Sequence, residues 1–305
     1  MIWYYLNINS GYMDLSIIIV NYKTYKLSKQ SINSVINKKH GFSFEIIVID
    51  NNSKDNSYNQ LKSTFKNEIE TGLVKFIAND KNEGFAVANN IGIKIAKGEF
   101  ILLLNSDTFV KNQAIGTTLN YIKENTDVGA IGCKVVLSNG TLDKACKRSF
   151  PEPKNSFYRL FGLAKLFPNN KKFNEYNLEH LDENGIYEVD SLMGAFMLVR
   201  KIAIDEVGLL DEDFFMYGED IDWCYRIKKA GWKIIYHGKS EIIHYKGASS
   251  KKKKSKLIYE FYRAMYLFYN KHYGKKYSIA TTILTYIGIG IMFLLKILLN
   301  IFKTK

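Results

Sequence analysis

Short apolar runs alternate with segments of helical periodicity through the first 136 residues, and this alternation constrains the fold more than any other feature of the chain. A short continuous apolar run bounded by polar residues or glycine is typical of a strand that is buried on both faces. Strands that alternate with helices predict a Rossmann-like, mostly parallel and doubly wound α/β sheet. We expect strands at 15–22, 44–50, 73–78, 100–104 and 128–136, and helices at 24–38, 57–66, 85–97 and 113–125.

The pattern is weaker in the second half of the chain. Residues 139–188 have little periodicity and contain all three prolines. We therefore expect a long insertion there, close to the functional site of the protein. Regular structure is expected again in a strand at 191–199 and a helix at 221–230. Gly231 is expected to end that helix, and Gly98 to end the helix at 85–97. A chain of 305 residues with 47% hydrophobic content can bury the core of one large domain.

The formal net charge of +13 is concentrated near the C-terminus. Residues 226–305 contain 18 Lys or Arg and 2 acidic residues, a net charge of +16, which leaves −3 for residues 1–225. This distribution argues against nucleic-acid binding and favours attraction of the C-terminal part to anionic lipid. The three cysteines, Cys133, Cys146 and Cys224, have no metal-ligand spacing and no even pairing, which favours a reducing compartment.

The two ends of the chain differ from its middle. Residues 1–13 have neither a basic region nor a long apolar core, so we expect a dispensable extension, not a signal peptide, before a domain at 14–250. Residues 251–305 form a basic helical segment, in which 277–295 carry no charge and are just long enough to cross a bilayer. This run predicts a membrane span or a membrane-embedded hairpin, and a soluble helix that docks on a partner is the alternative. The lysines within 251–256 either contact acidic headgroups or lie in a solvated loop.

Polar clusters fall at the carboxyl ends of the first four expected strands, or on the turns that follow them. Because these ends share one edge of a parallel sheet, the clusters predict a ligand pocket. Asp50 can accept a hydrogen bond from an imide N–H or a ribose hydroxyl, and Asp107 can hold a divalent ion against a diphosphate; each is otherwise an ordinary turn residue. The turn at 82–84 opens a helix whose backbone N–H groups could face a phosphate or a sugar hydroxyl. The clusters are Asn21-Tyr22, Asp50-Asn51-Asn52-Ser53, Asn82-Glu83-Gly84 and Asn105-Ser106-Asp107.

A second dense cluster spans residues 214–223, with the sequence Phe-Phe-Met-Tyr-Gly-Glu-Asp-Ile-Asp-Trp. The adjacent acids Glu219 and Asp220 start a helix, where the helix dipole favours negative charge. The alternative to a capping role is a general base, because a hydroxyl that attacks a sugar must lose its proton as the new bond forms. The expected aromatic shelf for the apolar face of the sugar consists of Phe214, Phe215, Tyr217 and Trp223.

Two further elements complete this expected site. Gly194-Ala195 would allow the backbone to approach an acceptor closely. His244, after a strand at 241–243, is either a further ligand to a metal or diphosphate, or a structural histidine. The chain contains no Gly-x-Gly-x-x-Gly fingerprint and no Walker A sequence, and the first absence argues against a nicotinamide dehydrogenase.

Together these motifs resemble glycosyltransferase family 2, and most of all its bacterial rhamnosyltransferase-like branch. The resemblance covers roughly residues 14–250. It implies a GT-A fold, a nucleoside-diphosphate-sugar donor carrying UDP, dTDP or GDP, a Mg²⁺ or Mn²⁺ ion, and inversion at the anomeric carbon. The motifs, in order, are Ile18-Ile19-Val20-Asn21-Tyr22, Ile49-Asp50-Asn51-Asn52-Ser53, Asn82-x-Gly84-Phe85-x-x-x-Asn89-Asn90-x-Gly92, Leu104-Asn105-Ser106-Asp107, Gly194-Ala195, Phe214-Phe215-Met216-Tyr217-Gly218-Glu219-Asp220-x-Asp222 and His244.

Carried over residue by residue, the resemblance implies that Asp50 meets the nucleotide base, Asp107 holds the metal and Asp220 takes the acceptor proton. We expect His244 as a further metal ligand. The sequence departs from the family at Asn105-Ser106-Asp107, where many relatives have Asp-x-Asp, and this weakens the expected metal affinity and leaves the identity of the ion open. The Gln-x-x-Arg-Trp signature of processive synthases is absent, which implies one sugar per acceptor. The expected donor-binding residues are Asn21, Tyr22, Asp50, Asn52, Asn82, Gly84, Asn89 and Ser106, and the expected acceptor-binding residues are Gly194, Ala195, Tyr217, Glu219 and Trp223.

The sequence thus predicts a metal-dependent, inverting and non-processive glycosyltransferase of surface polysaccharide synthesis, for which rhamnose is one candidate sugar. The expected acceptor is a polyprenyl-diphosphate-linked glycan at the cytoplasmic face of the cell membrane. Two alternatives stay open: a membrane-tethered, catalytically silent sugar- or nucleotide-binding protein, and a sugar nucleotidyltransferase. The latter should carry a Gly-rich loop with a basic residue after its first strand, and residues 21–24, Asn-Tyr-Lys-Thr, are not such a loop.

Overall fold

The computed structural model describes residues 13–160, 166–167, 175–246 and 254–303, so most of the expected extension lies outside the described residues. The first half contains β1 (Met13–Asn21), α1 (Tyr25–Ile36), β2 (Phe44–Asp50), α2 (Ser57–Thr64), α3 (Lys66–Glu70), β3 (Val74–Ala78), α4 (Phe85–Ile95), β4 (Gly98–Leu104), β5 (Thr108–Val110), α5 (Ala114–Glu124) and β6 (Val128–Leu137). The second half contains a 3₁₀ turn (Lys144–Cys146), α6 (Pro153–Leu160), β7 (Ile186–Glu188), β8 (Phe196–Arg200), α8 (Lys201–Val207), α9 (Glu219–Lys229), β9 (Lys233–His244), α10 (Lys254–His272) and α11 (Ile279–Lys303).

A nine-stranded sheet runs through the protein in the order β3-β2-β1-β4-β8-β6-β9-β5, with β7 paired to β9. The first four strands of this order are parallel, as the alternation of strands and helices predicts. The rest of the sheet is mixed, because β8 lies antiparallel between β4 and β6, and β5 and β7 run antiparallel to β9. The carboxyl ends of β1, β2 and β4 therefore meet at one edge of the sheet, where a ligand site is expected.

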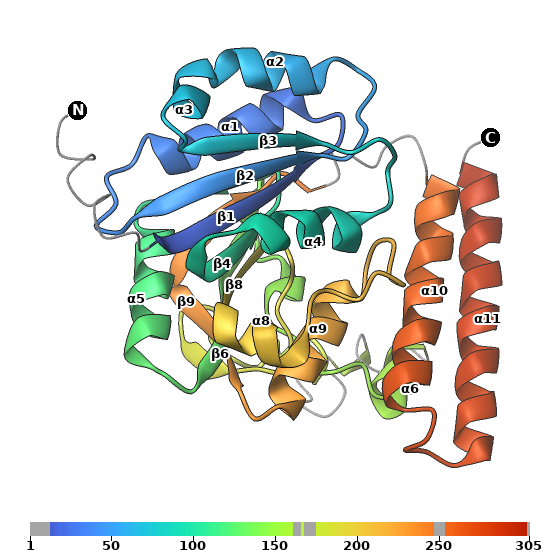
Figure 1. The fold of residues 1–305 in the computed structure, drawn as a ribbon. Coiled ribbons are helices and arrows are strands. Elements are labelled where there is room, and N and C mark those ends of the chain that lie inside the picture. The colour runs from blue at the N-terminus through green and yellow to red at the C-terminus, as the bar shows by residue number, and fades with distance from the viewer. Residues whose placement is uncertain (1–12, 161–165, 168–174, 247–253, 304–305) are drawn as a thin grey trace.

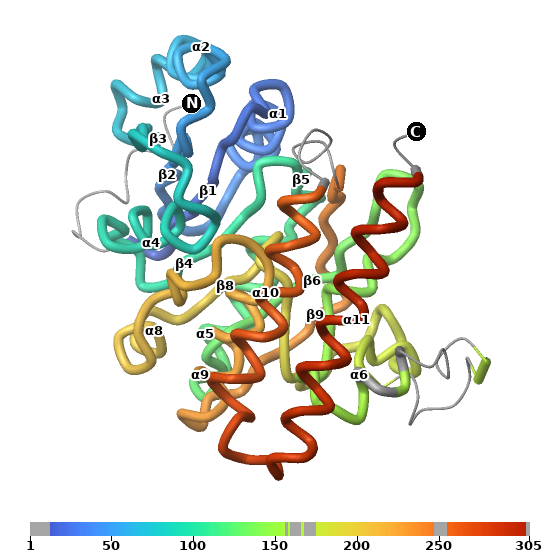
Figure 2. Tube along the Cα trace, turned by 90° about the vertical axis from the view of Figure 1, so that its right-hand side faces the viewer, coloured from blue at the N-terminus to red at the C-terminus, as the bar shows by residue number. Residues whose placement is uncertain are grey.

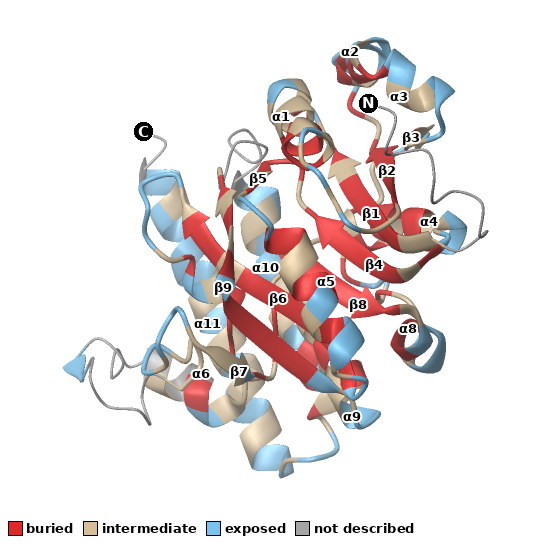
Figure 3. Cartoon of the chain, turned by 90° about the vertical axis from the view of Figure 1, so that its left-hand side faces the viewer, coloured by how far each residue is buried: buried red, intermediate tan, exposed pale blue. Residues whose placement is uncertain are grey.

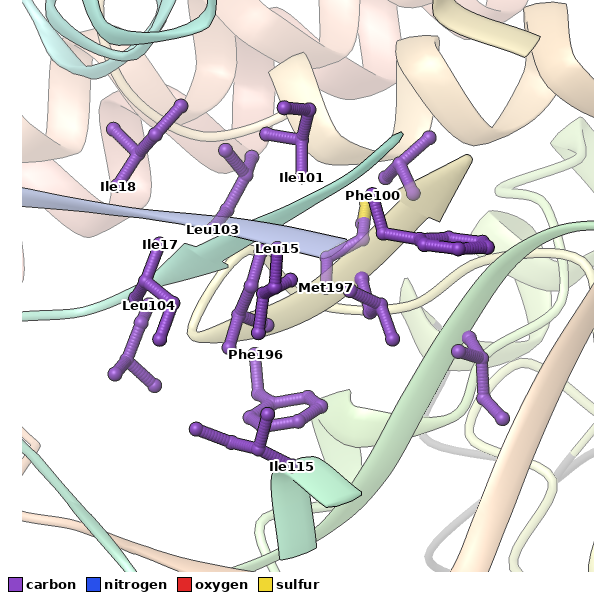
Figure 4. Close-up of a cluster of buried hydrophobic side chains, with 14 of the residues drawn as sticks. Leu15, Ile17, Ile18, Phe100, Ile101, Leu103, Leu104, Ile115, Phe196 and Met197 are labelled. Atoms are coloured by element: carbon purple, nitrogen blue, oxygen red, sulfur yellow. The ribbon is translucent and has the colours of Figure 1, made fainter. Parts of the chain in front are cut away.

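Helices cover both faces of the sheet and bury its central strands. Figure 1 shows α1, α2 and α3 on one side of the N-terminal strands and α4 on the other. All of β2 is buried, and so is most of β1 and β4, as the red strands in Figure 3 show. Figure 4 shows part of this core, in which Leu104 of β4 and Phe196 of β8 lie near Ile115 of α5. These side chains are shielded from water on both faces, which accounts for the continuous apolar runs in the sequence.

Two local expectations in this part of the chain are wrong. Gly98 does not end α4, which stops at Ile95; it begins β4. A Cβ on Gly98 would lie 2.4 Å from the backbone nitrogen of Ser16, so the glycine is needed where β4 approaches β1. The strand expected at 191–199 is also shorter, because β8 begins only at Phe196.

The last two helices form an antiparallel pair beside the α/β domain, as Figures 1 and 2 show. One face of α10 packs against the domain through a buried group that we call the α10 cluster. Ion pairs and hydrogen bonds join α10 to the domain as well. The boundary expected after residue 250 stays a prediction, but packing makes α10 continuous with the domain. The α10 cluster consists of Phe214, Ala264, Phe268, Tyr269 and Tyr273.

Candidate active site

Asp50 lies at the end of β2, where both oxygens of its carboxylate accept hydrogen bonds within the protein. It is 4% exposed, and its Oδ1 accepts hydrogen bonds from Asn21 Nδ2 at 2.6 Å and Ser53 Oγ at 2.5 Å, while its Oδ2 accepts from Ser53 N at 3.0 Å. Parallel pairing sets Asn21 directly opposite Asp50, which accounts for the first of these contacts. Asn21 itself is fully buried. It therefore orients Asp50 and does not present its own side chain to a donor.

A chain of hydroxyl and amide contacts links this corner to the end of β4. Ser106 Oγ lies 3.2 Å from Thr24 Oγ1, and Thr24 Oγ1 donates to Asn21 Oδ1 at 3.0 Å. Both Ser106 and Thr24 are buried. The predicted nucleotide corner at Asp50 and the predicted metal corner at Asp107 are therefore held together by one hydrogen-bonded network.

The turn before α4 is organised differently from the expectation. Asn82 Oδ1 accepts hydrogen bonds from Gly84 N and from Asn51 Nδ2, each at 3.1 Å. The N–H of Phe85 donates to the carbonyl of Phe215 at 2.8 Å, so this N–H is not available to a phosphate. Gly84 has φ +101°, and a Cβ there would lie 2.2 Å from the Phe215 oxygen. Gly84 thus lets the donor side of the site touch the segment that leads into Asp220.

Three other expected donor residues differ in their surroundings. Asn89 is 1% exposed and its Nδ2 donates to the Phe85 carbonyl within α4, so we assign it to helix packing and correct the expectation of a donor contact. Asn52 is half-buried, with Nδ2 donating to the Asp80 carbonyl at 2.8 Å. Tyr22 is half-buried at the end of β1. A donor contact by Asn52 or Tyr22 stays a prediction.

Asp107 and His244 meet because β5 pairs with β9 in a register that sets Thr108 opposite His244. His244 Nε2 lies 3.1 Å from Asp107 Oδ1, and both side chains are buried. On its other side His244 Nδ1 lies 3.6 Å from Asp143 Oδ2. Burial alone would lower the pKa of His244, but the contact with Asp107 and the charges of both carboxylates outweigh it and raise the pKa to about 9.

Asp143 is a member of this corner that sequence reasoning missed. Burial would raise its pKa, yet His244 and Lys246 together hold the pKa of this carboxyl well below its usual range. Its side chain also accepts from Ala145 N at 3.2 Å at the start of the 3₁₀ turn. An aspartate within the aperiodic stretch at 139–188 carries no signal in the sequence that would place it beside His244.

The corner at Asp107 and His244 suits a divalent ion whose coordination shell is completed by a bound substrate. One carboxylate oxygen and one imidazole nitrogen are donors that Mn²⁺ accepts, although the ion must first displace the proton that the raised pKa keeps on His244. Mg²⁺ commonly binds one or two carboxylates together with substrate phosphates. Within the described part of the chain, no group of three or more His, Cys, Asp or Glu residues could hold a metal by itself. The two predicted ligands therefore fit an ion whose remaining ligands come from a diphosphate and water.

Asp220 lies at the start of α9, beside the backbone of Gly194. Arg148 Nη2 donates to Asp220 Oδ2 at 2.8 Å, and Gly194 N donates to the same oxygen at 3.3 Å. The Ala195 carbonyl accepts from Asn105 N at 3.1 Å. Gly194-Ala195 therefore joins the carboxylate of Asp220 to the corner that carries Asp107. The predicted proton acceptor and the predicted metal ligand are thus separated by only two residues of backbone.

Glu219 and Asp220 differ in their surroundings, although they are adjacent. Glu219 is 6% exposed, and no hydrogen-bond partner for its Oε2 lies among the described residues. Burial, reinforced by the charge of Asp220, raises the pKa of Glu219 well above its usual range, so it keeps its proton near neutral pH. Asp220, in contrast, is paired with Arg148. The two neighbouring acids therefore differ: one has a cation as its partner, and the other has an oxygen without a partner among the described residues.

Arg148 is the second residue that sequence reasoning missed. It is 8% exposed, and its Nη2 contacts both Asp220 and the carbonyl of Leu192. A bridge between Arg148 and Ser191 brings the aperiodic stretch alongside the segment before β8. An arginine that is buried against one carboxylate fixes both the charge and the direction of that carboxylate.

The predicted aromatic shelf is only partly present. Trp223 is fully buried and its Nε1 donates to the Gly208 carbonyl at 2.9 Å, so the expectation that it stacks on a sugar is wrong. Phe214 is also buried, in the α10 cluster. Tyr217 remains accessible at 39% exposure, and Phe215 is half-buried beneath the ammonium group of Lys256, 3.8 Å from the ring centroid. The accessible aromatic surface next to Asp220 is therefore Tyr217 and Phe215.

Comparison with known proteins gives a family and a fold. The model of the family described as glycosyl transferase family 2 matches residues 16–208. The low-salt glycan biosynthesis hexosyltransferase Agl10 of Haloferax volcanii is 28% identical over 225 residues, which are 72% of this chain and 64% of that protein. The N-acetylglucosaminyl-diphospho-decaprenol L-rhamnosyltransferase of Mycobacterium tuberculosis is 33% identical over 113 residues, 37% of this chain and 36% of that protein.

Among solved structures, the mannosyltransferase PcManGT of Pyrobaculum calidifontis, in complex with GDP-Man and Mn²⁺, has a similar fold. Its TM-score is 0.58 at 13% identity, over 85% of this chain and 64% of that one. The expectation of a GT-A fold is confirmed. The matches span less than two thirds of the length of the two curated relatives. The acids of α9 lie beyond residue 208, outside the matched family region, so their role rests on geometry.

Proposed function

Because the chain belongs to glycosyltransferase family 2, we propose that it transfers one sugar from a nucleoside diphosphate sugar to a glycan acceptor, with inversion at the anomeric carbon. The observation that carries this proposal is the two-residue bridge of Gly194-Ala195 between Asp220 and the corner of Asp107. A proton acceptor and a diphosphate site on opposite sides of one reacting carbon are what a single displacement needs. The hexosyltransferase and rhamnosyltransferase relatives support a hexose or rhamnose as the transferred sugar.

In the proposed reaction the acceptor hydroxyl oxygen attacks the anomeric carbon. The new carbon–oxygen bond forms as the bond from that carbon to the diphosphate breaks, and the nucleoside diphosphate leaves with the bonding electrons. The hydroxyl proton passes to the carboxylate of Asp220, which Arg148 and Gly194 hold in place. Glu219 is protonated and can donate a hydrogen bond to an acceptor hydroxyl, a role that a second carboxylate could not perform.

The donor would be held along the edge of the sheet. Asp50, oriented by Asn21 and Ser53, would accept a hydrogen bond from the base or ribose. Asp107 and His244 would hold Mg²⁺ or Mn²⁺. A divalent ion bound there supplies positive charge to the departing diphosphate. The Mn²⁺ in the PcManGT complex supports this part of the proposal.

The proposed acceptor is a polyprenyl-diphosphate-linked glycan at the cytoplasmic face of the membrane, in surface polysaccharide synthesis. Two observations support it. One curated relative is named for a decaprenol-linked substrate. In addition, Ile279–Phe302 is long and apolar enough for a membrane, with a mean hydropathy of 2.2.

The test is incubation of the full-length protein with a panel of UDP-, dTDP- and GDP-sugars and a polyprenyl-diphosphate-linked sugar, with product mass and released nucleoside diphosphate as readouts. We expect one donor to give an acceptor that is heavier by one sugar. Binding of a sugar nucleotide without turnover would favour a silent binding protein. Formation of a sugar nucleotide from a sugar phosphate would favour a nucleotidyltransferase. Either of these results would refute the proposed function.

A further inference from the structure

The length of α11 alone would allow it to cross a bilayer. The apolar stretch Ile279–Phe302 has 24 residues, about 36 Å of helix at the usual rise, against a hydrocarbon core of about 30 Å. No residue in the most apolar part of this stretch is buried in the structure. Composition and length therefore do not distinguish a span from a helix that lies along the membrane surface.

Contacts with α10 run along almost the whole of α11. Near the connecting turn Tyr269 Oη lies 3.0 Å from Thr282 Oγ1, and further along the Tyr266 and Tyr286 rings are 5.0 Å apart. At the far end Asn300 Nδ2 donates to Ser255 Oγ at 3.3 Å, across 45 positions of sequence. Figure 2 shows the two helices side by side over this length. To cross a bilayer away from the domain, α11 would have to give up all of these contacts.

The other face of α10 is attached to the α/β domain by charged groups that need water or polar partners. His272 Nε2 lies 2.7 Å from Asp222 Oδ1. Lys271 forms ion pairs with Asp211 and Asp213. Together with the α10 cluster, these contacts prevent α10 from entering the hydrocarbon core, because each charge there would be costly to bury. While α11 stays on α10, it lies beside the domain.

The face of α11 that points away from α10 is a continuous apolar surface, which we call the α11 face. Each of its side chains is at least half exposed. A helix of this length with apolar residues on one face presents a patch of several hundred Å², larger than a monomer in water usually leaves exposed. The α11 face consists of Ile279, Ile283, Leu284, Ile287, Ile291, Leu294, Leu295, Leu298, Leu299, Ile301 and Phe302.

The groups that border the α11 face match an anionic lipid surface. Residues 279–303 contain Lys296 and Lys303 but no acidic residue, and the exposed Lys275 and Lys276 precede them. Tyr259 and Tyr266 of α10 are 52% and 44% exposed and touch aromatic rings of α11. Exposed tyrosines are enriched at membrane–water interfaces, and lysines there are attracted to anionic headgroups.

We propose that α11 lies in the plane of an anionic membrane surface, with the α11 face among the lipids and α10 as a fixed support, and that it does not cross the bilayer. The partner is a lipid bilayer. In this arrangement the α/β domain keeps one orientation to the membrane, because α10 packs against α9 on one side and against α11 on the other.

The arrangement also sets the position of the acceptor side of the site. Phe261 of α10 lies against the Tyr217 ring, with centroids 5.8 Å apart, and Tyr217 precedes Asp220 by three residues. The Tyr217 segment therefore lies one helix pair, about 20 Å, from the lipid-facing surface. This consequence rests on the proposed function. It selects an acceptor whose reacting hydroxyl lies near its lipid anchor, within the first few sugars.

A cross-link between the helices tests the proposal directly. Ser255→Cys and Asn300→Cys place two thiols at the free end of the pair, and a short bismaleimide joins them; the native cysteines are buried. The assay is flotation of full-length protein with vesicles of phosphatidylcholine and phosphatidylglycerol, and with phosphatidylcholine alone. We expect the cross-linked protein to float with the anionic vesicles as well as the untreated double variant does. Loss of flotation on cross-linking would show that α11 must leave α10, and would overturn the proposal.

Substitutions on the α11 face give a second, independent measurement. Leu284→Glu with Leu295→Glu should lower vesicle partitioning by about tenfold or more, because two charges enter the contact surface. The matched control is Ile202→Glu on α8, an isoleucine that is 61% exposed and distant in sequence from the helix pair, and it should float like the parent. Unchanged flotation of the double variant, or a stable dimer in which a second copy covers the face and which does not float, would refute the proposal.

A soluble acceptor analogue separates this inference from the proposed function. We expect the Leu284→Glu, Leu295→Glu protein to transfer sugar to the soluble analogue at the parental rate and to fail only on lipid-linked acceptor. A protein that floats but transfers sugar to neither acceptor would support the membrane inference and refute the proposed function.

Discussion

Replacing Gly84 with alanine tests whether the close contact between the turn before α4 and Phe215 holds the site together. Gly84 combines a left-handed backbone, φ +101°, with a position where a Cβ would lie 2.2 Å from the Phe215 carbonyl oxygen. Neither strand pairing nor side-chain packing can absorb such an overlap, because the atom that is hit belongs to the backbone. The turn and the Phe215 segment must separate by more than 1 Å, roughly the shortfall from ordinary contact.

The expected loss of stability has two parts. With φ +101° and ψ −177°, Gly84 lies in a backbone region that essentially only glycine adopts, and a side chain there costs about 1–3 kcal/mol. Separation also breaks the hydrogen bond from Phe85 N to Phe215 O, and leaving these groups unpaired costs about 1–3 kcal/mol. We therefore expect Gly84→Ala to lower the free energy of unfolding by about 2–6 kcal/mol. Because Phe215 lies five residues before Asp220, sugar transfer should fall as well.

Two other glycines provide matched controls in the same urea-unfolding assay, with tryptophan fluorescence as the readout and the full-length protein in mild detergent. Gly72 has φ +77° but nothing within 4 Å of the place that an alanine methyl group would occupy, so Gly72→Ala should show only the conformational cost, about 1–2 kcal/mol. Gly41 has neither feature, and Gly41→Ala should change stability by less than about 1 kcal/mol. If Gly84→Ala is no worse than Gly72→Ala, the close approach to Phe215 is not required and the reasoning fails.

Three further predictions concern buried charged groups. Asp107→Ala should abolish transfer and weaken donor binding by calorimetry only when Mg²⁺ or Mn²⁺ is present; parental turnover in excess chelator would remove the metal role. Arg148→Met should slow transfer more than Arg148→Lys does, because methionine leaves the buried Asp220 carboxylate without a cation and lysine does not; equal rates for the two variants would mean that Arg148 does not act through Asp220. Burial favours a raised pKa for Asp222, but His272 and Arg226 outweigh it and lower the pKa. The stability lost in Asp222→Asn should therefore be largest above about pH 4, the pKa of an aspartate in the unfolded chain, and should shrink as the pH falls further. A constant difference in the free energy of urea unfolding between about pH 7 and 3 would contradict this.

The parallel half of the fold follows from the sequence because its signals are local. The run at 44–50 predicts β2 to the residue, since every side chain of that strand is buried and the pattern is unbroken. The polar residues at the ends of β1, β2 and β4 then share an edge by topology alone. This places Asn21, Asp50 and Asp107 correctly without any knowledge of side-chain contacts.

The other half depends on contacts between distant segments, which periodicity does not encode. The antiparallel insertion of β8 between β4 and β6 requires pairing of residue 100 with residue 200. Arg148 and Asp143 reach the site from the aperiodic stretch, through single bridges and a short turn. The prediction for Trp223 is wrong although the sequence holds a signal against it. Trp223 and Ile227 are one helical turn apart on the buried face of α9, and this spacing favours core packing over sugar contact.

The most direct test of the account is the rate of sugar transfer by Asp220→Asn in a single turnover at saturating donor and acceptor. Asparagine keeps an oxygen toward Arg148 and Gly194 but cannot take the acceptor proton at neutral pH. We predict donor binding close to that of the parent and transfer slower by about 10²–10⁴-fold, with a much smaller loss for Glu219→Gln, since Glu219 is already protonated. Transfer by Asp220→Asn at the parental rate would contradict the assignment of Asp220 as the proton acceptor.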